Sequence, residues 1–274
     1  MWLIPIIILF VFVIYIFLIF PTKPSKEDYL LFSKRSYAHR GFHDNEKGPS
    51  ENTLQAFVLA SEHNYGIELD VQLTKDRKVV VFHDSDLSRT SAIDRKILDI
   101  TYEELKEIKV FDRETIPLFS EVLSNISNNT PVIVEIKSEG NRDWINETCK
   151  LTYEIMKEHS GIYCIESFDP LAVGWFAKHA PQYVRGQLSM AKKKYEGNTK
   201  PIAAFLLHNL FLNFISRPHF IAYDHEDKSM SMNISKILGC MIVKWTVKNQ
   251  TRHNELQPKV DGIIFEGYTP KETW

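Results

Sequence analysis

The sequence has few cysteines, almost no net charge and no secretory signal, and each absence narrows the possible functions. Its three cysteines, Cys149, Cys164 and Cys240, are widely spaced and flanked by apolar residues. This spacing excludes a disulfide framework and a cysteine metal site, and it predicts buried thiols. A formal net charge of −2 gives no sign of a nucleic-acid binder. The rest of the composition, 44% hydrophobic over 274 residues, is that of a globular protein with one large core.

The amino-terminal run Trp2–Phe20 contains 19 residues and no charge. This is close to the ~20 residues that a helix needs to cross a bilayer. The run lacks the basic start and the small-residue cleavage site of a secretory signal. We therefore expect an uncleaved single-pass transmembrane helix over residues 1–22 and a juxtamembrane linker over 23–35. Basic residues follow the run and none precedes it, which favours a cytoplasmic catalytic domain.

From residue 36 onward, short β-like runs alternate with helix-sized connections, the pattern of a parallel sheet with right-handed crossovers. Several runs are continuous and β-branched, as strands buried on both faces are. Eight such strands would close a TIM (β/α)8 barrel over residues 36–274. The nine runs are Ser36–His39, Ile67–Leu73, Val79–His83, Val132–Lys137, Tyr163–Phe168, Val184–Leu188, Phe220–Asp224, Met241–Val247 and Gly262–Phe265.

The second and third of these runs must be antiparallel. Only the four residues KDRK separate Val71–Thr74 from Val79–Phe82, whereas a parallel crossover needs a dozen or more. If Asp76 and Arg77 are the two turn residues, Asp70 faces His83 across the hairpin. The sequence therefore predicts a carboxylate beside a histidine, and a returning strand that stands outside the count of eight.

Charged side chains end several predicted strands, at the rim where barrels of this kind place their catalytic groups. Alternation along a strand puts Glu68 and Asp70 on one face, and Glu135 and Lys137 share that relation on the next parallel strand. Three carboxylates at one rim repel one another unless a cation bridges them. An all-oxygen ligand set favours a hard ion, so we expect Mg²⁺ or Ca²⁺.

Two histidines, His39 and His83, belong to the same rim. Imidazoles beside such a cation suit proton transfer to and from phosphate-ester oxygens, because their pKa values lie near neutrality. Arg40 and Lys137 would neutralise the phosphate. Taken singly, each of these residues also fits a turn or a solvent-facing position, so the interpretation depends on their occurring together at matching strand ends.

The ordered fragments AHRG, ENTLQAF, ELDVQLTKDRKVVVFHD, RT, IPLFSEVL and VEIK resemble the glycerophosphodiester phosphodiesterase family. The resemblance starts near Ser36, is strongest through Lys137 and extends to the carboxyl terminus. It implies a TIM barrel with a small insertion after the second strand, at about residues 85–117. It also implies a divalent cation and hydrolysis of a phosphodiester to an alcohol and a phosphomonoester.

The family's functional residues carry over to matching positions of this sequence. Its acid/base pair becomes His39 and His83, and its phosphate contacts become Arg40 and Lys137. Its metal ligands become Glu68, Asp70 and Glu135.

Two positions depart from the family pattern and leave the substrate's leaving group open. Lys248 follows WTV, where the family usually has asparagine, and Glu266 lies near a position that is often aspartate. Phe168 and Trp245 end strands, and they pack either on the glycerol or alcohol group of the substrate or in the core. Glu51 either orients the site or belongs only to the start of a helix.

A polar loop follows the first strand. His43, Asp44 and Glu46 in this loop could join the metal site, or they could simply cover the mouth of the barrel. We expect Asn52 to cap the helix that begins near Thr53.

These residues predict metal-dependent hydrolysis of glycerophosphodiesters, with water or a neighbouring glycerol hydroxyl as the nucleophile. A second hypothesis is a lysophospholipase D, in which the run Pro201–Ile215 forms an apolar ledge at the membrane; that run could equally be a helix packed on the barrel. The run KKKY at 192–195 is either a solvated loop or a contact with anionic lipid. A third hypothesis is a catalytically inactive barrel that binds a ligand or a protein.

Overall fold

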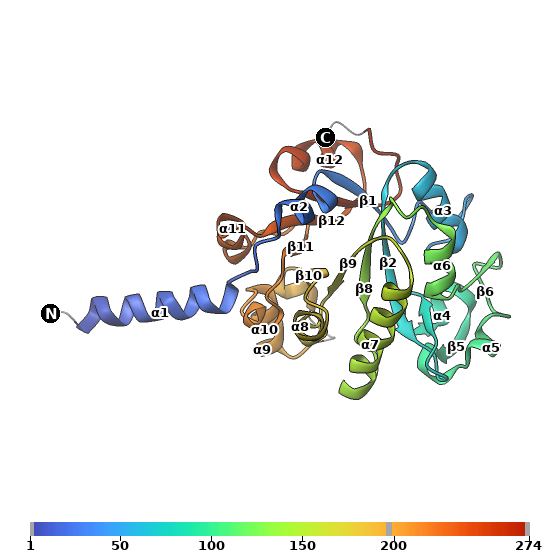
Figure 1. Cartoon of the computed structure of the whole chain (residues 1–274), viewed down its shortest axis with the longest axis horizontal. Helices are drawn as coiled ribbons and strands as arrows, with labels where there is room; N and C mark the ends of the chain where they lie inside the picture. Colours follow the sequence, from blue (N-terminus) through green and yellow to red (C-terminus); the bar gives the residue numbers. More distant parts are fainter. Residues whose placement is uncertain (1–2, 196–198, 272–274) are drawn as a thin grey trace.

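A closed barrel of eight parallel strands dominates the computed structural model, which describes residues 3–195 and 199–271 (Figure 1). Pairing between the first and second strands closes the ring, so the TIM barrel expected from the sequence is confirmed. In sheet order the barrel strands are β1 (Arg35–His39), β13 (Gly262–Phe265), β12 (Met241–Val247), β11 (Phe220–Asp224), β10 (Val184–Ser189), β9 (Ile162–Ser167), β8 (Pro131–Ile136) and β2 (Gly66–Leu73).

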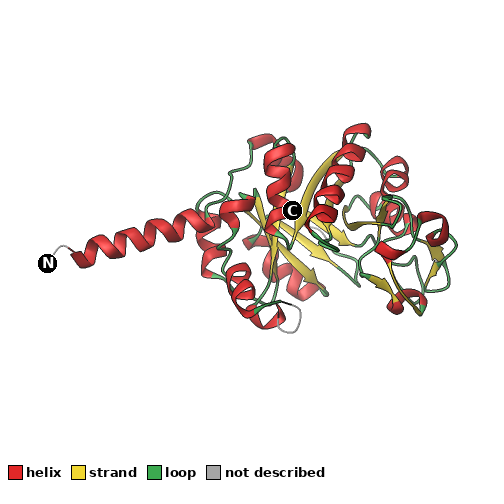
Figure 2. Cartoon of the chain, turned by 90° about the horizontal axis from the view of Figure 1, so that it is seen from below, coloured by secondary structure: helices red, strands yellow, loops and turns green. Residues whose placement is uncertain are grey.

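Helices surround the barrel on its outside (Figure 2). Their ends follow local signals: at one of them Asp169 accepts a hydrogen bond from the amide of Leu171 at 2.8 Å, and Pro170 occupies the first turn. The outer helices are α3 (Leu54–Glu62), α6 (Phe119–Asn125), α7 (Arg142–Glu158), α8 (Pro170–His179), α9 (Pro201–His208), α10 (Asn213–Ser216), α11 (Met230–Ile237) and α12 (Gln250–Leu256), with short turns η2 (Lys192–Tyr195) and η3 (Gln257–Lys259).

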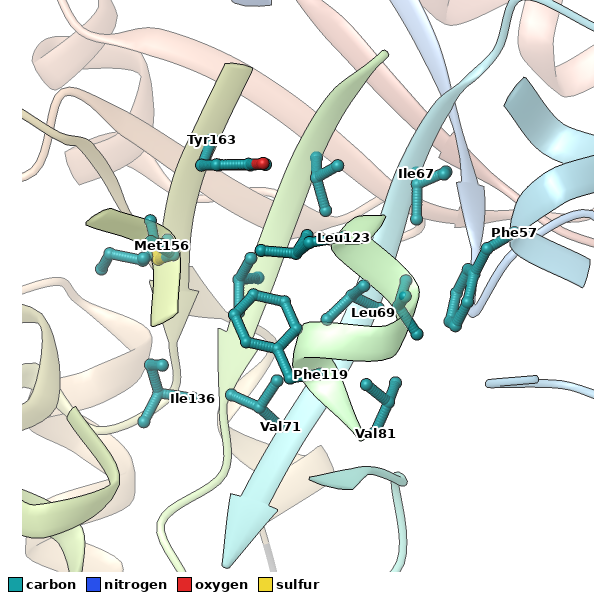
Figure 3. Packing of buried hydrophobic residues seen from close by; sticks show 14 of the residues in the cluster. Phe57, Ile67, Leu69, Val71, Val81, Phe119, Leu123, Ile136, Met156 and Tyr163 are labelled. Carbon is teal, nitrogen blue, oxygen red and sulfur yellow. The ribbon is translucent and has the colours of Figure 1, made fainter. Parts of the chain in front are cut away.

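The largest apolar core lies between the barrel wall and the helices outside it. Ile67, Leu69 and Val71 of β2 are fully buried in this core, where α6 packs over them (Figure 3). Because side chains alternate along a strand, the intervening Glu68 and Asp70 point into the barrel. Packing of the apolar face of β2 on the outer core therefore places two carboxylates inside the barrel.

The antiparallel hairpin after β2 is confirmed, but its register differs by one residue from the prediction. β3 (Val79–Val81) returns beside β2, and Asp70 lies opposite Phe82, whose amide donates to the Asp70 carbonyl at 3.0 Å. The loop has three residues rather than two, because Arg77 adopts the left-handed conformation at φ 63°. His83 therefore lies beyond the end of β3, in the loop that follows it.

A small insertion stands between β3 and α6, where the sequence places it. It has its own apolar core, in which Leu87, Ile97 and Ile100 are fully buried. Its elements are β4 (Asp86–Leu87), α4 (Ser88–Ser91), β5 (Ile93–Lys96), η1 (Ile97–Asp99), α5 (Tyr102–Leu105), β6 (Lys109–Val110) and β7 (Glu114–Thr115).

The amino-terminal segment requires a correction. α1 (Leu3–Ile19) has 17 residues and projects away from the barrel (Figure 1). In the ranges 3–195 and 199–271, no helix is long and apolar enough to cross a membrane. The transmembrane helix expected over residues 1–22 is therefore not supported: α1 has 17 described residues, which at 1.5 Å per residue reach about 25 Å against the ~30 Å of a hydrocarbon core. Met1 and Trp2 lie outside the described residues.

Two further segments bound the barrel. α2 (Lys26–Phe32) follows α1 and inserts Phe32 among the interior residues at the amino-terminal end of the barrel strands. The run 201–215 forms α9 and α10 rather than one helix, because Leu210 adopts a left-handed conformation at φ 59° and ends the first of them.

Candidate active site

A cavity of about 270 Å³ opens at the carboxyl ends of the barrel strands. Three predicted site residues outside its lining, Glu51, Asp70 and Lys137, have side chains that contact lining residues. The ends of seven of the eight barrel strands contribute to it. Its lining residues are His39, Arg40, Glu68, His83, Glu135, Glu166, Phe168, Leu188, Trp245, Thr246, Lys248, Ile264 and Glu266.

The three predicted metal ligands come together at the floor of this cavity. Glu68, Asp70 and Glu135 are all buried, and ligand oxygens of the three lie within 4.8 Å of one another. Burial and the neighbouring carboxylates raise the pKa of Glu68 well above its usual range. A hard divalent cation would relieve this repulsion and accept an all-oxygen ligand set, so the residues fit such an ion.

Two cationic side chains flank the carboxylate cluster. Lys137 Nζ lies 3.0 Å from Glu135 Oε1 and 3.3 Å from Asp70 Oδ1. Arg40 Nε lies 3.6 Å from Asp70 Oδ2. Burial alone would raise the pKa of Asp70, but the charge of Lys137 and those of other nearby cations hold it well below its usual range. Asp70 is therefore ionised, and the cluster combines three acidic groups with two basic ones.

The backbone after β1 explains the sequence His-Arg-Gly. Arg40 has a left-handed φ of 54°, which turns its own amide toward Glu68 Oε2 at 3.0 Å. Gly41 follows at φ 82°, and a Cβ there would come within 2.8 Å of the Cβ of Ala56. Glycine is therefore required where the loop passes α3, and the strained turn at Arg40 is held by a contact with the carboxylate cluster.

His39 is held by a carboxylate that sequence reasoning did not assign to this role. Its Nδ1 lies 2.5 Å from Glu266 Oε2, and Lys248 Nζ lies 3.3 Å from Glu266 Oε1. Although burial raises the pKa of Glu266, the hydrogen bond from His39 and the nearby positive charges hold it below its usual range. An ionised carboxylate only accepts, so Nδ1 of His39 carries the proton and Nε2 is left for the cavity. The two departures from the family pattern thus contact each other.

His83 has a corresponding arrangement on the opposite side. Its Nδ1 lies 2.6 Å from Asp84 Oδ1, and Arg89 of the insertion donates through Nε to Asp84 Oδ2 at 2.7 Å. The same guanidinium reaches Glu51 at 2.6 Å and 3.0 Å, and Arg40 donates to Glu51 at 2.7 Å. Glu51 therefore orients Arg40 directly, which favours the site-orienting alternative for this residue.

Glu166 is a further residue that sequence reasoning missed. It lies on β9 opposite Glu135 and is 1% exposed. Burial and the charge of Glu135 raise its pKa well above the usual range, so this side chain is a neutral acid in the cavity wall. The signal was present in the sequence, since a glutamate within the apolar run of β9 has no solvent-facing side to occupy.

The expected cap at Asn52 is wrong. The residue that precedes α3 is Thr53, and its side chain makes no capping hydrogen bond. Asn52 has a left-handed φ of 55° and donates through Nδ2 to Asp70 Oδ2 at 2.8 Å. Its amide side chain therefore positions a carboxylate of the cluster.

The polar loop after β1 contributes no residue to the carboxylate cluster of Glu68, Asp70 and Glu135. Asp44 is exposed, and it accepts hydrogen bonds from the amides of Glu46 and Lys47 at 2.9 Å and 3.2 Å. Burial lowers the pKa of His43. Among the described residues, the acidic group suited to a metal ion contains none of these three predicted loop residues.

The aromatic residues form an apolar wall. Phe168 and Trp245 pack edge to face with ring centroids 5.6 Å apart, and both are partly buried. Leu188 and Ile264 line the same cavity. The wall lies in the cavity that contains the carboxylates, so core packing and substrate contact are compatible here.

Comparisons with known proteins agree with this geometry. Residues 39–267 match the model of the glycerophosphoryl diester phosphodiesterase family. A glycerophosphodiester phosphodiesterase of Caldanaerobacter subterraneus is 41% identical over 250 residues, covering 84% of this chain and 92% of that protein. A human lysophospholipase D is 30% identical over 163 residues, covering 54% of this chain and 50% of that protein.

A solved structure shows the same fold. The crystal structure of a glycerophosphodiester phosphodiesterase from Thermotoga maritima has a TM-score of 0.63 and 28% identity, covering 84% of this chain and 93% of that chain. The family model spans nearly the whole barrel, and the carboxylates, histidines and cations that the resemblance names converge on one cavity. The chain therefore belongs to the glycerophosphoryl diester phosphodiesterase family and is a phosphoric diester hydrolase.

Proposed function

We propose that this chain hydrolyses glycerophosphodiesters to an alcohol and glycerol phosphate, with His39 and His83 as the general acid/base pair. One observation carries the proposal. Each of the two imidazoles is hydrogen-bonded through Nδ1 to a carboxylate, at 2.5 Å and 2.6 Å, and both line one cavity. This arrangement fixes the tautomer and leaves each Nε2 to exchange a proton with substrate.

The three carboxylates Glu68, Asp70 and Glu135 would hold the divalent cation, Mg²⁺ or Ca²⁺. When bound, such an ion polarises the phosphoryl group as a Lewis acid. Charge supports this composition: the three acids with Arg40 and Lys137 carry one net negative charge when all are ionised. A divalent ion converts this to one net positive charge, which complements the single negative charge of a phosphodiester.

The two histidines would divide the proton transfers. One accepts a proton from the nucleophile, and the other donates a proton to the alkoxide that departs. Glu266 and Asp84 stabilise the imidazolium that forms on the accepting side, because each is an ionised hydrogen-bond acceptor at Nδ1. The nucleophile is water, or the neighbouring glycerol hydroxyl through a cyclic phosphate that water then opens.

The remaining predicted residues would bind the substrate. Arg40 and Lys137 contact the phosphoryl oxygens, and the contact of Arg40 with Glu51 holds its guanidinium in place. Phe168 and Trp245 pack on the glycerol or alcohol group, which suits their position on the apolar wall of the cavity.

Product release by the full chain with glycerophosphocholine as substrate tests the proposal. We expect turnover that requires Mg²⁺ or Ca²⁺ and stops with a chelator. His39→Ala and His83→Ala should each lower turnover by ~10²–10⁴-fold. His63→Ala is a matched control, because this exposed histidine lies at the end of α3 outside the cavity. Near-normal turnover by His83→Ala would remove this residue from the mechanism.

Lysophospholipids are the second candidate substrates. The apolar wall favours them, since Phe168, Leu188 and Trp245 offer an acyl-bearing glycerol a surface that a water-soluble diester does not need. The human relative named lysophospholipase D is consistent with this substrate class. Parallel assays with glycerophosphocholine and lysophosphatidylcholine separate the two, because a preference for the soluble diester contradicts this alternative. Cation binding without turnover of either substrate would instead support an inactive ligand-binding barrel.

A further inference from the structure

Exposed apolar side chains gather around the base of α1. Helices α9 and α10 lie on one side of this base and α11 on the other (Figure 1). We refer to the five large apolar residues on these helices as the apolar collar. They are Ile202, Phe205, Phe214, Met230 and Ile237, with exposed fractions of 77%, 46%, 38%, 71% and 84%.

The collar and α1 form one continuous surface. The ring of Tyr15 packs edge-on against Phe211 at 5.8 Å, and Phe17 stacks on Phe214 at 5.9 Å. The Tyr15 hydroxyl lies 3.0 Å from Ser231 Oγ on α11. The base of α1 is therefore fixed to both sides of the collar, and its outer part extends the same apolar surface into the surroundings.

The part of the barrel that bears the collar is strongly basic. Residues 170–254 contain 12 lysines and arginines but four acidic residues, whereas the whole chain has 33 and 35. Exposed lysines stand one or two positions from collar residues: Lys200 precedes Ile202, and Lys228 precedes Met230. Among the described residues, neither lysine takes part in an ion pair. Free cationic groups therefore alternate with apolar ones over this face.

The kind of partner follows from the shape and chemistry of this surface. Over the outer part of α1, residues 3–14, the large apolar side chains have exposed fractions from 42% at Ile14 to 71% at Leu3. A protein groove covers one face of a helix, whereas the acyl layer of a lipid surrounds every face. The lysines beside the collar complement negatively charged head groups. We infer that the apolar collar and α1 bind an anionic lipid surface, with the collar side chains at the boundary between head groups and acyl chains.

Arg217 marks the level of that boundary. Its guanidinium lies over the rings of Phe17 and Phe20, with its carbon 4.9 Å and 5.9 Å from the ring centroids, and it donates to the Phe20 carbonyl at 2.9 Å. A cation held against aromatic rings at the end of an apolar helix is the arrangement that suits a head-group region.

This surface adjoins the candidate active site. Tyr195, in the turn before α9, packs edge to face on Phe168 of the cavity wall with centroids 6.4 Å apart. The turn before α9 therefore contacts the cavity wall. The inference goes beyond the proposed function, because it holds for any diester that the chain cleaves.

Fluorescence quenching in vesicles tests the inference. Ile202→Cys and Met230→Cys in the full chain are labelled with an environment-sensitive dye, and the unmodified chain gives the background from the buried native thiols. The chain is reconstituted into phosphatidylcholine vesicles with and without phosphatidylglycerol, with a nitroxide quencher on the acyl chains. Glu107→Cys is the control, because Glu107 is exposed and follows α5 of the insertion, and α5 lies at the far end of the molecule from α1 (Figure 1).

We expect severalfold stronger quenching at positions 202 and 230 than at 107, and more with phosphatidylglycerol than without it. The double variant Lys200→Glu/Lys228→Glu should weaken the collar's contact with anionic vesicles by about tenfold or more and leave it nearly unchanged on neutral ones. Equal quenching at all three labelled positions would overturn the inference. Quenching that is the same with and without phosphatidylglycerol, and that the charge reversal leaves unchanged, would overturn the inference that the lipid surface is anionic. Thermal unfolding of each variant verifies the fold without relying on catalysis.

Discussion

Glu51 offers a sharp test of how the insertion is coupled to the site. Its carboxylate accepts hydrogen bonds from Arg40, Asn45 and Arg89, and the side chain is 7% exposed. Burial opposes ionisation, but the hydrogen bond from Arg89 and the charges of both arginines lower the pKa of Glu51 to about 2. Glu51→Gln keeps the shape and removes the charge. We expect it to destabilise the fold and to release Arg40.

The size of the expected destabilisation follows from the pKa shift of Glu51. Folding lowers the pKa of Glu51 from its usual 4.5 to about 2, and each unit corresponds to about 1.4 kcal/mol, which gives ~3 kcal/mol at neutral pH as an upper value. The folded-state pKa is depressed, so this contribution is complete above pH 4.5 and is lost as the pH falls toward 2. At about pH 3.5, ~2 kcal/mol of this contribution to the free energy of unfolding remains.

Urea unfolding of the parent and of Glu51→Gln measures the difference. The parent should be more stable by up to ~3 kcal/mol at pH 7, and the gap should narrow on acidification. Glu46→Gln is a matched control, because it makes the same change at an exposed carboxylate in the neighbouring loop and should alter stability by less than ~0.5 kcal/mol. A gap that is absent at pH 7, or that is equally large near pH 3.5, would refute the assigned role of the buried charge.

Three further predictions concern the catalytic groups. Glu266→Gln should lower kcat and move the limb of the kcat/KM profile that reports His39 to lower pH, because burial already lowers the pKa of His39 and the variant removes the hydrogen bond that opposes this shift. A pH–rate profile in which neither limb moves would contradict the pairing. Asp84→Asn should reduce kcat by ~10²-fold or more with little change in KM, as measured by steady-state kinetics, because Asp84 orients the imidazole of His83. Glu68→Ala should abolish cation binding in calorimetry while the chain stays folded, and retained cation binding would exclude this residue as a ligand.

The barrel could be predicted from the sequence because its strands are buried on both faces. Such strands appear as continuous apolar runs, and each of the nine predicted runs coincides with an observed strand within about two residues. The hairpin register could not be predicted in the same way. It depends on the left-handed conformation of Arg77, and an arginine gives no local signal for that conformation. Glycine or asparagine there would have indicated the three-residue loop.

The amino-terminal helix shows a different limit. Apolar composition indicated a helix correctly, but composition does not determine where a helix ends. Proline follows Phe20, and the chain leaves α1 after Ile19 to reach the barrel, where the Thr22 amide donates to the Pro218 carbonyl at 2.9 Å. Pro21 disfavours helical backbone at Phe20, a signal beyond the apolar run that composition alone does not use.

The predicted site residues were those that face a common cavity from different strands, because alternation and strand ends determine where such side chains point. Several residues that position these groups from loops or from the insertion were missed. Arg89 orients His83 through Asp84, and Asn52 positions a carboxylate from a loop. These roles arise only when segments distant in the sequence meet, so spacing along the chain carries no signal of them.

The departures at Lys248 and Glu266 have a physical reason that neither residue suggests alone. Although burial raises the pKa of Glu266, the hydrogen bond and the charge of His39 hold this half-buried carboxylate below its usual pKa range. Lys248, which is largely exposed and has its Nζ 3.3 Å from Glu266 Oε1, adds a smaller effect of the same sign. The other histidine, His83, is held by Asp84, which in turn pairs with Arg89. Both imidazoles are therefore hydrogen-bonded through Nδ1 to a carboxylate that also lies within 3.3 Å of a cationic side chain.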